Sequence, residues 1–224
     1  MNELLQETTA LASNEARKGL LITIEGGEGA GKTSTVHELG ERLKSEGHKV
    51  LITREPGGLP TGEAIRSVLL GDEGMNLETL SQVLLFSAAR LEHLEKKVLP
   101  ALAEGYIVLL DRYYDSTLVY QGIVGGYDFK RIKDITNLVI GGAVPDKTYI
   151  LDIEVEHAQN RLSQREGEQT WFDKQPKAYH ERVRNGFLHL AMLPENAERI
   201  EVVDASASLE VVTEDVYRRV QKLL

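Results

Sequence analysis

The chain has 224 residues, a length that suits one compact domain better than two. Hydrophobic residues make up 42% of it and charged residues 27%, which excludes a collagen-like or strongly disordered chain. Its 26 basic and 35 acidic side chains leave a net charge of −9, which disfavours nucleic acids and anionic membranes as partners unless a local basic site intervenes. The lack of cysteine excludes disulfides, thiolate metal sites and cysteine nucleophiles. No apolar run approaches the roughly 20 residues that span a bilayer, so we expect a cytoplasmic protein.

Residues 1–18 are polar and form an N-terminal extension of unknown role, ahead of a predicted domain over residues 19–224. Helical periodicity runs from Thr33 to Ser45 and over a long apolar stretch from Leu77 to Ala103. Five short apolar runs predict buried strands: Leu20–Ile24, Val50–Thr53, Tyr106–Leu110, Thr148–Leu151 and Arg199–Val203. Strands that alternate with helices predict an α/β fold, in which a five-stranded parallel sheet is flanked by helices.

A glycine-rich loop between the first predicted strand and the next helix matches the pattern G-x-x-x-x-G-K-[ST]. It consists of Gly26, Gly27, Glu28, Gly29, Ala30, Gly31, Lys32 and Thr33. The backbone N–H groups of such a loop wrap a phosphate, and the helix that follows adds its positive end. Lys32 would reach the β and γ phosphates of a nucleotide, and the Thr33 hydroxyl would bind Mg²⁺. A chance glycine-rich turn is the alternative, but the flanking strand and helix favour a P-loop NTPase.

Two charged residues at the ends of predicted strands are the next candidates. Asp111 follows the strand that ends at Leu110, a position where P-loop folds hold magnesium through water; an acid that simply ends a strand is the alternative. Arg54 lies in the segment Thr53–Gly58 (TREPGG), where it would clamp a phosphate with two hydrogen bonds. A solvated arginine in a turn is the alternative there.

Phe86 and Arg90 are four residues apart on the long predicted helix and therefore share a face. A ring and a guanidinium so placed would stack on a base and hydrogen-bond to its edge. A core phenylalanine beside an exposed arginine has the same spacing, so these two residues alone leave the choice open.

Together these motifs resemble the thymidylate kinase family, over about Gly19–Leu224. The most specific match is Asp111–Gly122 (DRYYDSTLVYQG), which looks like the family segment D-R-Y-x-x-S-x-x-x-Y-Q-G. Thr53–Gly58 and Phe86–Arg90 match further family motifs in the same order. The resemblance, to bacterial-type members, implies a nucleoside monophosphate kinase-like fold, ATP as phosphoryl donor, Mg²⁺ as cofactor, and phosphorylation of dTMP to dTDP in dTTP synthesis. It also implies a homodimer packed through the long helix.

The resemblance further implies a role for each matching residue. Lys32 and Arg112 would be catalytic, with Arg112 between the donor and acceptor phosphates, while Thr33 and, through water, Asp111 would hold magnesium. The residues implied to bind dTMP are Glu28 at the 3′-hydroxyl, Arg54 and Arg112 at the phosphate, Phe86 and Arg90 on the base, Ser116, Thr117 and Gln121 at the base edge, and Tyr120 at the sugar 2′ position. The turn Val203–Ser206 would lie near the adenine of ATP.

A predicted lid, at about residues 166–176, departs from the family pattern. Bacterial-type members show D-R-x-E there, whereas the aligned stretch here is Thr170–Asp173 (TWFD), so Trp171 stands where an arginine is expected. Arg161 and Arg165 match the family spacing R-x-x-x-R and are the candidate catalytic cations, with Lys174 as the fallback. A solvated helix face is the alternative for both arginines.

Other functions remain open at this point. Another nucleoside monophosphate kinase or a deoxynucleoside kinase would use the same loop, and the altered lid would suit a non-catalytic nucleotide-binding module. A regulatory GTPase would need an N-K-x-D sequence, which the chain lacks. The six histidines show no metal-ligand spacing and are expected to be structural or solvated: His37, His48, His93, His157, His180 and His189.

Overall fold

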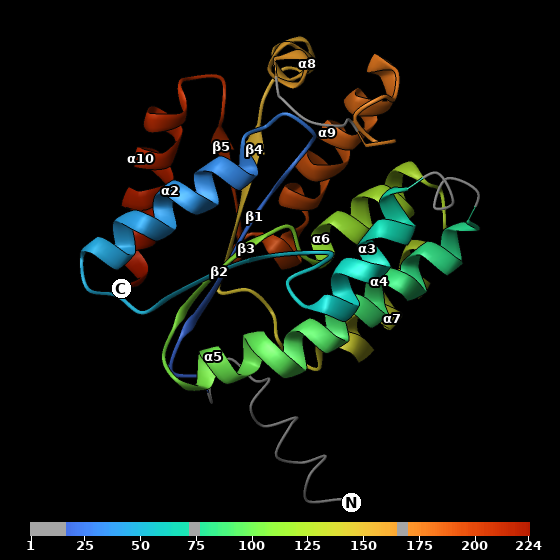
Figure 1. Cartoon of the computed structure of the whole chain (residues 1–224). Coiled ribbons are helices and arrows are strands. Elements are labelled where there is room, and N and C mark those ends of the chain that lie inside the picture. Colours follow the sequence, from blue (N-terminus) through green and yellow to red (C-terminus); the bar gives the residue numbers. More distant parts are fainter. Residues whose placement is uncertain (1–16, 72–76, 165–169) are drawn as a thin grey trace, which may run out of the picture.

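The computed structural model describes residues 17–71, 77–164 and 170–224 (Figure 1). Five parallel strands form one sheet in the order β2-β3-β1-β4-β5, which confirms the predicted fold class. The strands are β1 (Leu20–Gly26), β2 (Val50–Arg54), β3 (Ile107–Asp111), β4 (Lys147–Asp152) and β5 (Ile200–Asp204). Each strand ends one or two residues later than its apolar run predicts, because the polar residues that follow continue the ladder. These late residues include Arg54 and Asp111, two of the predicted site residues.

Helices cover both faces of the sheet (Figure 1). On one face α2 (Lys32–Ser45) and α10 (Leu209–Val220) pack on the strands, and on the other α4 (Thr79–His93), α5 (Leu99–Ala103), α7 (Phe129–Ile140) and α9 (Lys177–Met192) do so. Within β3, Ile107 and Leu109 belong to the core beneath α2 and α10, and Val108 and Leu110 belong to the core on the opposite face. Since successive side chains of a strand point to opposite faces, this central strand is apolar throughout.

Shorter helices complete the part of the chain that the structure describes. They are α3 (Pro60–Leu70), α6 (Tyr114–Thr117), α8 (Val155–Ser163), π-helical turns at Leu94–Val98 and Leu118–Val124, and 3₁₀ turns at Pro194–Asn196 and Gln221–Leu223. The long helix predicted from Leu77 to Ala103 is present as α4, the π-helical turn after it and α5, without a break between them. Across the described ranges, none of these helices has the length and hydropathy that a bilayer span requires.

The strand register decides where the motifs meet. Asp111 of β3 lies opposite Ile24 of β1 on one side and Arg54 of β2 on the other. The glycine-rich loop, the TREPGG segment and the Asp111–Gly122 segment therefore leave the sheet at one edge. In open α/β sheets this carboxyl edge is where ligands bind.

Candidate active site

The glycine-rich loop connects β1 to α2 and brings its lysine into the cleft. Gly29 has φ +75, and a Cβ there would lie 2.4 Å from the Ala158 carbonyl oxygen, so only glycine fits this turn. Lys32 Nζ donates to the Gly27 carbonyl at 2.6 Å. Burial and the nearby Arg112 lower the pKa of Lys32 to about 8, so an arriving anion would favour its charged form.

Thr33 and Asp111 bring two oxygen atoms together beside the lysine. The Thr33 hydroxyl donates to Asp111 Oδ2 at 2.5 Å, which links the start of α2 to the end of β3. Hydroxyl and carboxylate oxygens are the ligands that Mg²⁺ prefers. The oxygen atoms of Thr33 and Asp111 therefore form a pair of ligands that fits the magnesium ion implied by the sequence.

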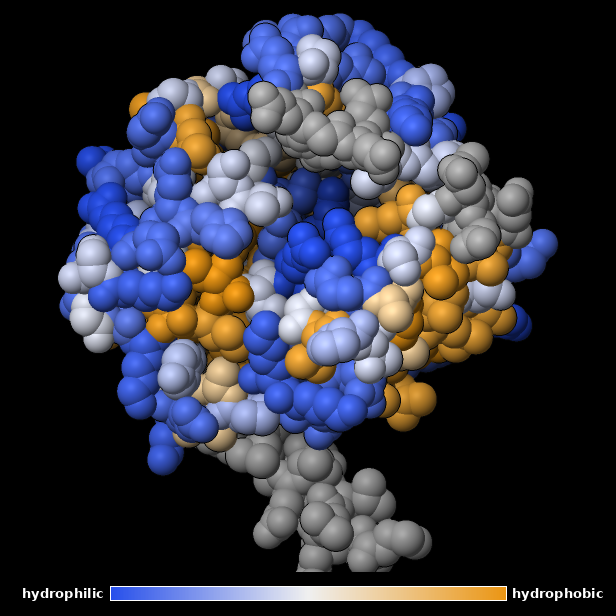
Figure 2. All heavy atoms as spheres, viewed as in Figure 1, coloured by the Kyte–Doolittle hydropathy of each residue, from blue (hydrophilic) through white to orange (hydrophobic). Residues whose placement is uncertain are grey.

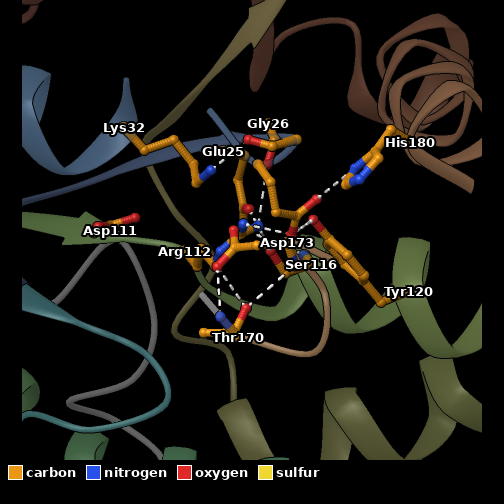
Figure 3. A network of polar contacts seen from close by, with 12 residues as sticks. Glu25, Gly26, Lys32, Asp111, Arg112, Ser116, Tyr120, Thr170, Asp173 and His180 are labelled. Carbon is orange, nitrogen blue, oxygen red and sulfur yellow. Dashed lines mark hydrogen bonds and ion pairs between the residues drawn. The ribbon is translucent and has the colours of Figure 1, made fainter. Parts of the chain in front are cut away.

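Arg112 lies at the centre of a polar network, which Figure 3 shows from close by. Its backbone has φ 65, a left-handed conformation that side-chain-bearing residues seldom adopt. Its guanidinium donates to the Gly26 carbonyl at 3.0 Å, to Ser116 Oγ at 3.1 Å and to Glu28 Oε1 at 3.2 Å. Although burial opposes its charge, Tyr120 and Glu28 raise the pKa of Arg112, so the cation is permanent.

Glu28 is the acid inside the loop, and its side chain is buried. The Tyr120 hydroxyl donates to its Oε1 at 2.5 Å, and His180 Nδ1 of α9 lies 3.5 Å from its Oε2. Burial favours the neutral acid, but His180, Arg112 and Lys32 outweigh it and lower the pKa of Glu28 to about 2. Glu28 is therefore a carboxylate that ties the glycine-rich loop to α9.

The Phe86 and Arg90 pair lies on the face of α4 that looks into the same cleft. Arg90 is 2% exposed; its Nε donates to Glu55 Oε2 at 2.7 Å and its Nη2 to Thr117 Oγ1 at 3.1 Å. Among the described residues, its Nη1 is buried without a hydrogen-bond partner. Glu55 is held in turn by His93 Nδ1, 3.2 Å away. The arginine is therefore fixed by two of its nitrogens and keeps a third for another acceptor.

One cleft collects every residue that the resemblance implies for dTMP: Glu28, Arg54, Phe86, Arg90, Arg112, Ser116, Thr117, Tyr120 and Gln121. Hydrophilic residues line a hollow on the face that Figure 2 shows. A second pocket lies along the glycine-rich loop and is lined by Arg161 and by Ser208, Leu209 and Val212. The two pockets share Glu28, Lys32, Thr33 and Asp173, so they meet at the end of the loop.

The lid is described from Thr170 onward, and Arg165 lies outside the described residues. Trp171 packs on Phe172 and on Tyr179 at ring-centroid distances of 5.1 and 6.0 Å, and Phe172 meets Tyr120 at 5.5 Å. An aromatic contact therefore lies where an arginine is expected. Lys174 is exposed.

Arg161 lines the second pocket, but its guanidinium is turned to the other wall. Its Nη2 donates to the Ala207 carbonyl at 2.9 Å and to the Ser206 carbonyl at 3.5 Å. It therefore joins α8 to the segment that precedes α10.

Two residues of the site were not selected from the sequence. Arg66 of α3 lines the first pocket, donates to the Pro56 carbonyl at 3.0 Å, and adds a cation near Arg54. Its position on the first helix after TREPGG was the sequence feature that could have identified Arg66 as a site residue. His180 was grouped with structural or solvated histidines, yet it contacts Glu28. His93 is buried and structural, whereas the other four histidines are exposed: His37, His48, His157 and His189.

Comparison with known proteins places these features in a family. A family model described as thymidylate kinase matches residues 24–216. A thymidylate kinase of Shouchella clausii is 41% identical over 210 residues, which cover 93% of this chain and 97% of that protein. A thymidylate kinase of Marinomonas sp. is 40% identical over 206 residues, covering 92% and 96% of the two chains. The crystal structure of thymidylate kinase from Ehrlichia chaffeensis superposes with a TM-score of 0.72 at 34% identity, covering 91% of this chain and 98% of that one.

The contact between Glu28 and His180 predicts a measurable titration. The Glu28 carboxylate, through its hydrogen bond and charge, raises the pKa of His180 above the ordinary value. The folded state therefore binds the proton more tightly than the unfolded chain does. The pair therefore stabilises the fold fully below the unfolded pKa, and this stabilisation is lost as pH rises through the folded one. We expect Glu28→Gln to lower the His180 midpoint in an NMR titration of the imidazole protons. His180→Gln assigns the resonance, and an unchanged midpoint in Glu28→Gln would show that the carboxylate does not hold the proton.

Proposed function

Because the chain belongs to the thymidylate kinase family and phosphorylates dTMP to dTDP, we propose that ATP occupies the pocket along the glycine-rich loop and dTMP the cleft beside it. The observation that carries this arrangement is the junction of the two pockets at Glu28, Lys32 and Thr33. A γ phosphate held by the loop and an acceptor phosphate in the cleft would face each other there. Phosphoryl transfer needs little more than such in-line placement and neutralised charge.

The base would lie between Phe86 and Arg90. The ring stacks on thymine, and the buried Nη1 of Arg90, which lacks a partner among the described residues, donates to the base O4. Thr117 and Gln121 line the same part of the cleft, and Tyr120 crowds the sugar 2′ position. An unpaired buried donor costs about 1–3 kcal/mol, so a base that supplies its acceptor is favoured over one that does not.

Cations on four separate elements would neutralise the phosphates in a chain of net charge −9. Arg54 and Arg66 hold the acceptor phosphate, Lys32 holds the donor, and Arg112 bridges the two. Because Arg112 is already oriented by three hydrogen bonds, it needs no reorganisation when charge develops in the transition state.

Thr33 and Asp111 would hold Mg²⁺, Thr33 through its hydroxyl and Asp111 through water. Bound there, the ion would neutralise charge on the phosphates of ATP. The two side chains would orient it at the junction of the pockets.

We further propose a bacterial-type enzyme with an altered lid. The packing of Trp171 on Phe172, and of Phe172 on Tyr120, supports closure by apolar contacts, which exclude water from the transferred group. Arg161 would supply the remaining cation by releasing the Ala207 carbonyl when ATP binds, with Arg165 as its partner.

A homodimer packed through α4 is the proposed assembly. Leu80, Leu84 and Leu91 are 37, 52 and 44% exposed and recur on one face of this helix. A second copy would bury them. Action in the cytoplasm is proposed as well, in keeping with the cysteine-free sequence.

Substrate choice tests the acceptor site. ADP release from ATP and Mg²⁺ should be fastest with dTMP among dTMP, dUMP, UMP, dCMP, AMP, GMP and thymidine. Arg90→Ala should raise the KM for dTMP and weaken its preference over dCMP, whose base carries an amino group in place of O4, because the donor to O4 is lost. Unchanged dTMP kinetics in Arg90→Ala would refute the base site, and turnover of thymidine in place of dTMP would remove Arg54 from its role.

The role of Arg161 predicts a defect in the chemical step. Arg161→Ala should lower kcat about 10- to 100-fold while the KM for dTMP stays the same, since the residue lies in the donor pocket. Lys174→Ala, an exposed lid residue, is the matched control and should keep kcat. Full kcat in Arg161→Ala together with a loss in Lys174→Ala would reassign the catalytic cation to Lys174.

The proposed dimer predicts that a charged substitution at its interface lowers the mass of the assembly in solution. Sedimentation equilibrium should give about twice the chain mass, and Leu84→Glu, which places a charge on the buried patch, should give a monomer. Leu138→Glu, at an exposed leucine of α7, is the control and should remain dimeric. A monomeric parent chain would rule out the proposed assembly.

A further inference from the structure

Glu25 is a buried acid for which the proposed reaction has no direct use. It is the penultimate residue of β1, is fully buried, and precedes the glycine-rich loop. Burial and the nearby Asp115 carboxylate raise its pKa to about 7, so keeping a carboxyl group here is costly. An apolar residue would suit the surrounding core better. The contacts of Glu25 explain what the acid does.

Within the described part of the chain, the Glu25 carboxylate accepts three hydrogen bonds, all from the turn and the short helix α6 that follow β3. Its Oε1 accepts from the Tyr113 backbone N–H at 2.7 Å and from the Ser116 N–H at 3.3 Å, while its Oε2 accepts from Ser116 Oγ at 2.6 Å. Figure 3 shows Glu25, Arg112 and Ser116 close together in this network. A single side chain from one strand therefore fixes the turn that leaves the neighbouring strand.

That turn contains the strained backbone of Arg112. A non-glycine residue at φ 65 persists only where its surroundings hold it, and here the two flanking peptide groups are held. The Arg112 N–H donates to the Ile24 carbonyl at 3.1 Å, and the next N–H, of Tyr113, donates to Glu25. The acid thus helps to keep Arg112 in the conformation that brings its guanidinium to the loop.

A second link reaches the guanidinium itself. Arg112 Nη1 donates to Ser116 Oγ, and Ser116 Oγ donates its own hydrogen to Glu25 Oε2. A hydroxyl has one hydrogen, so giving it to the carboxylate turns the oxygen lone pairs of Ser116 toward the arginine. In its ionised form, Glu25 can only accept here, and this fixes the direction of the chain of hydrogen bonds.

We propose that Glu25 is a positioning residue for phosphoryl transfer, which acts through Ser116 and the Arg112 backbone to hold the Arg112 guanidinium between the two phosphates. The inference rests on the role proposed above for Arg112. It also explains why an acid, and not a neutral hydrogen-bonding residue, stands next to the end of β1.

Glu25→Gln tests the proposal because it keeps the size and the acceptor for the backbone N–H groups while it reverses the bond to Ser116. Measured by ADP release at saturating ATP and dTMP, kcat should fall about 10- to 100-fold with the KM for ATP unchanged. Thr23→Val is the matched control: Thr23 lies on the same face of β1 and loses a buried 2.7 Å hydrogen bond to Thr148, yet among the described residues it makes no hydrogen bond to Glu25, Ser116 or Arg112. Its kcat should stay at the parent value.

A double-mutant cycle separates positioning from a merely structural role. In an Arg112→Ala background, where kcat is already low, Glu25→Gln should change kcat by no more than about twofold. An equal fold loss in both backgrounds, or no loss in the parent, overturns the proposal. A parent-like kcat in Arg112→Ala alone would instead refute the role of Arg112. Should Glu25→Gln fail to fold, Ser116→Ala cuts the same chain and must show the same dependence on Arg112.

Discussion

The parallel register of three adjacent strands is the constraint on which the site depends. Because β2, β3 and β1 run side by side in one direction, the residues after each strand emerge at one edge, where Asp111 lies opposite both Ile24 and Arg54. Segments far apart in the chain thus supply the loop, the arginine and the acid that we propose for the donor, the acceptor and the metal. A shift of one residue would turn every side chain of a strand to the opposite face.

The edge is then organised by buried carboxylates that hold arginines. Glu55 holds Arg90 in the cleft, at the proposed base site, and Glu28 holds Arg112 at the proposed phosphate site. Buried ion pairs add little net stability, because the desolvation of both charges offsets their attraction. Their value here is geometric: each guanidinium is fixed before substrate arrives, and a fixed dipole or charge need not reorganise during the reaction.

One altered position in the lid changes which residues can supply positive charge to the site. Trp171 stands in place of the expected arginine and packs on Phe172. Phe172 in turn packs on Tyr120 of the cleft. Aromatic packing excludes water but contributes no positive charge. In the proposed reaction the charge would then come from residues on the sheet edge and on helices, above all Lys32 and Arg112, and from Arg161 once it leaves its carbonyl partners.

The sequence by itself determined the five strands and the glycine-rich loop, which depend on local periodicity and spacing, while its resemblance to a family indicated nine residues that line one cleft. Only the tertiary structure brought His180 of α9 to Glu28, Arg66 into the cleft and Glu25 under the Arg112 turn. These contacts join elements that no short motif spans. The sequence pattern also does not distinguish a buried acid from any other polar residue near the end of a strand. Which partners satisfy a buried charge is set by packing between distant segments, so it was decided by the fold and not by spacing along the chain.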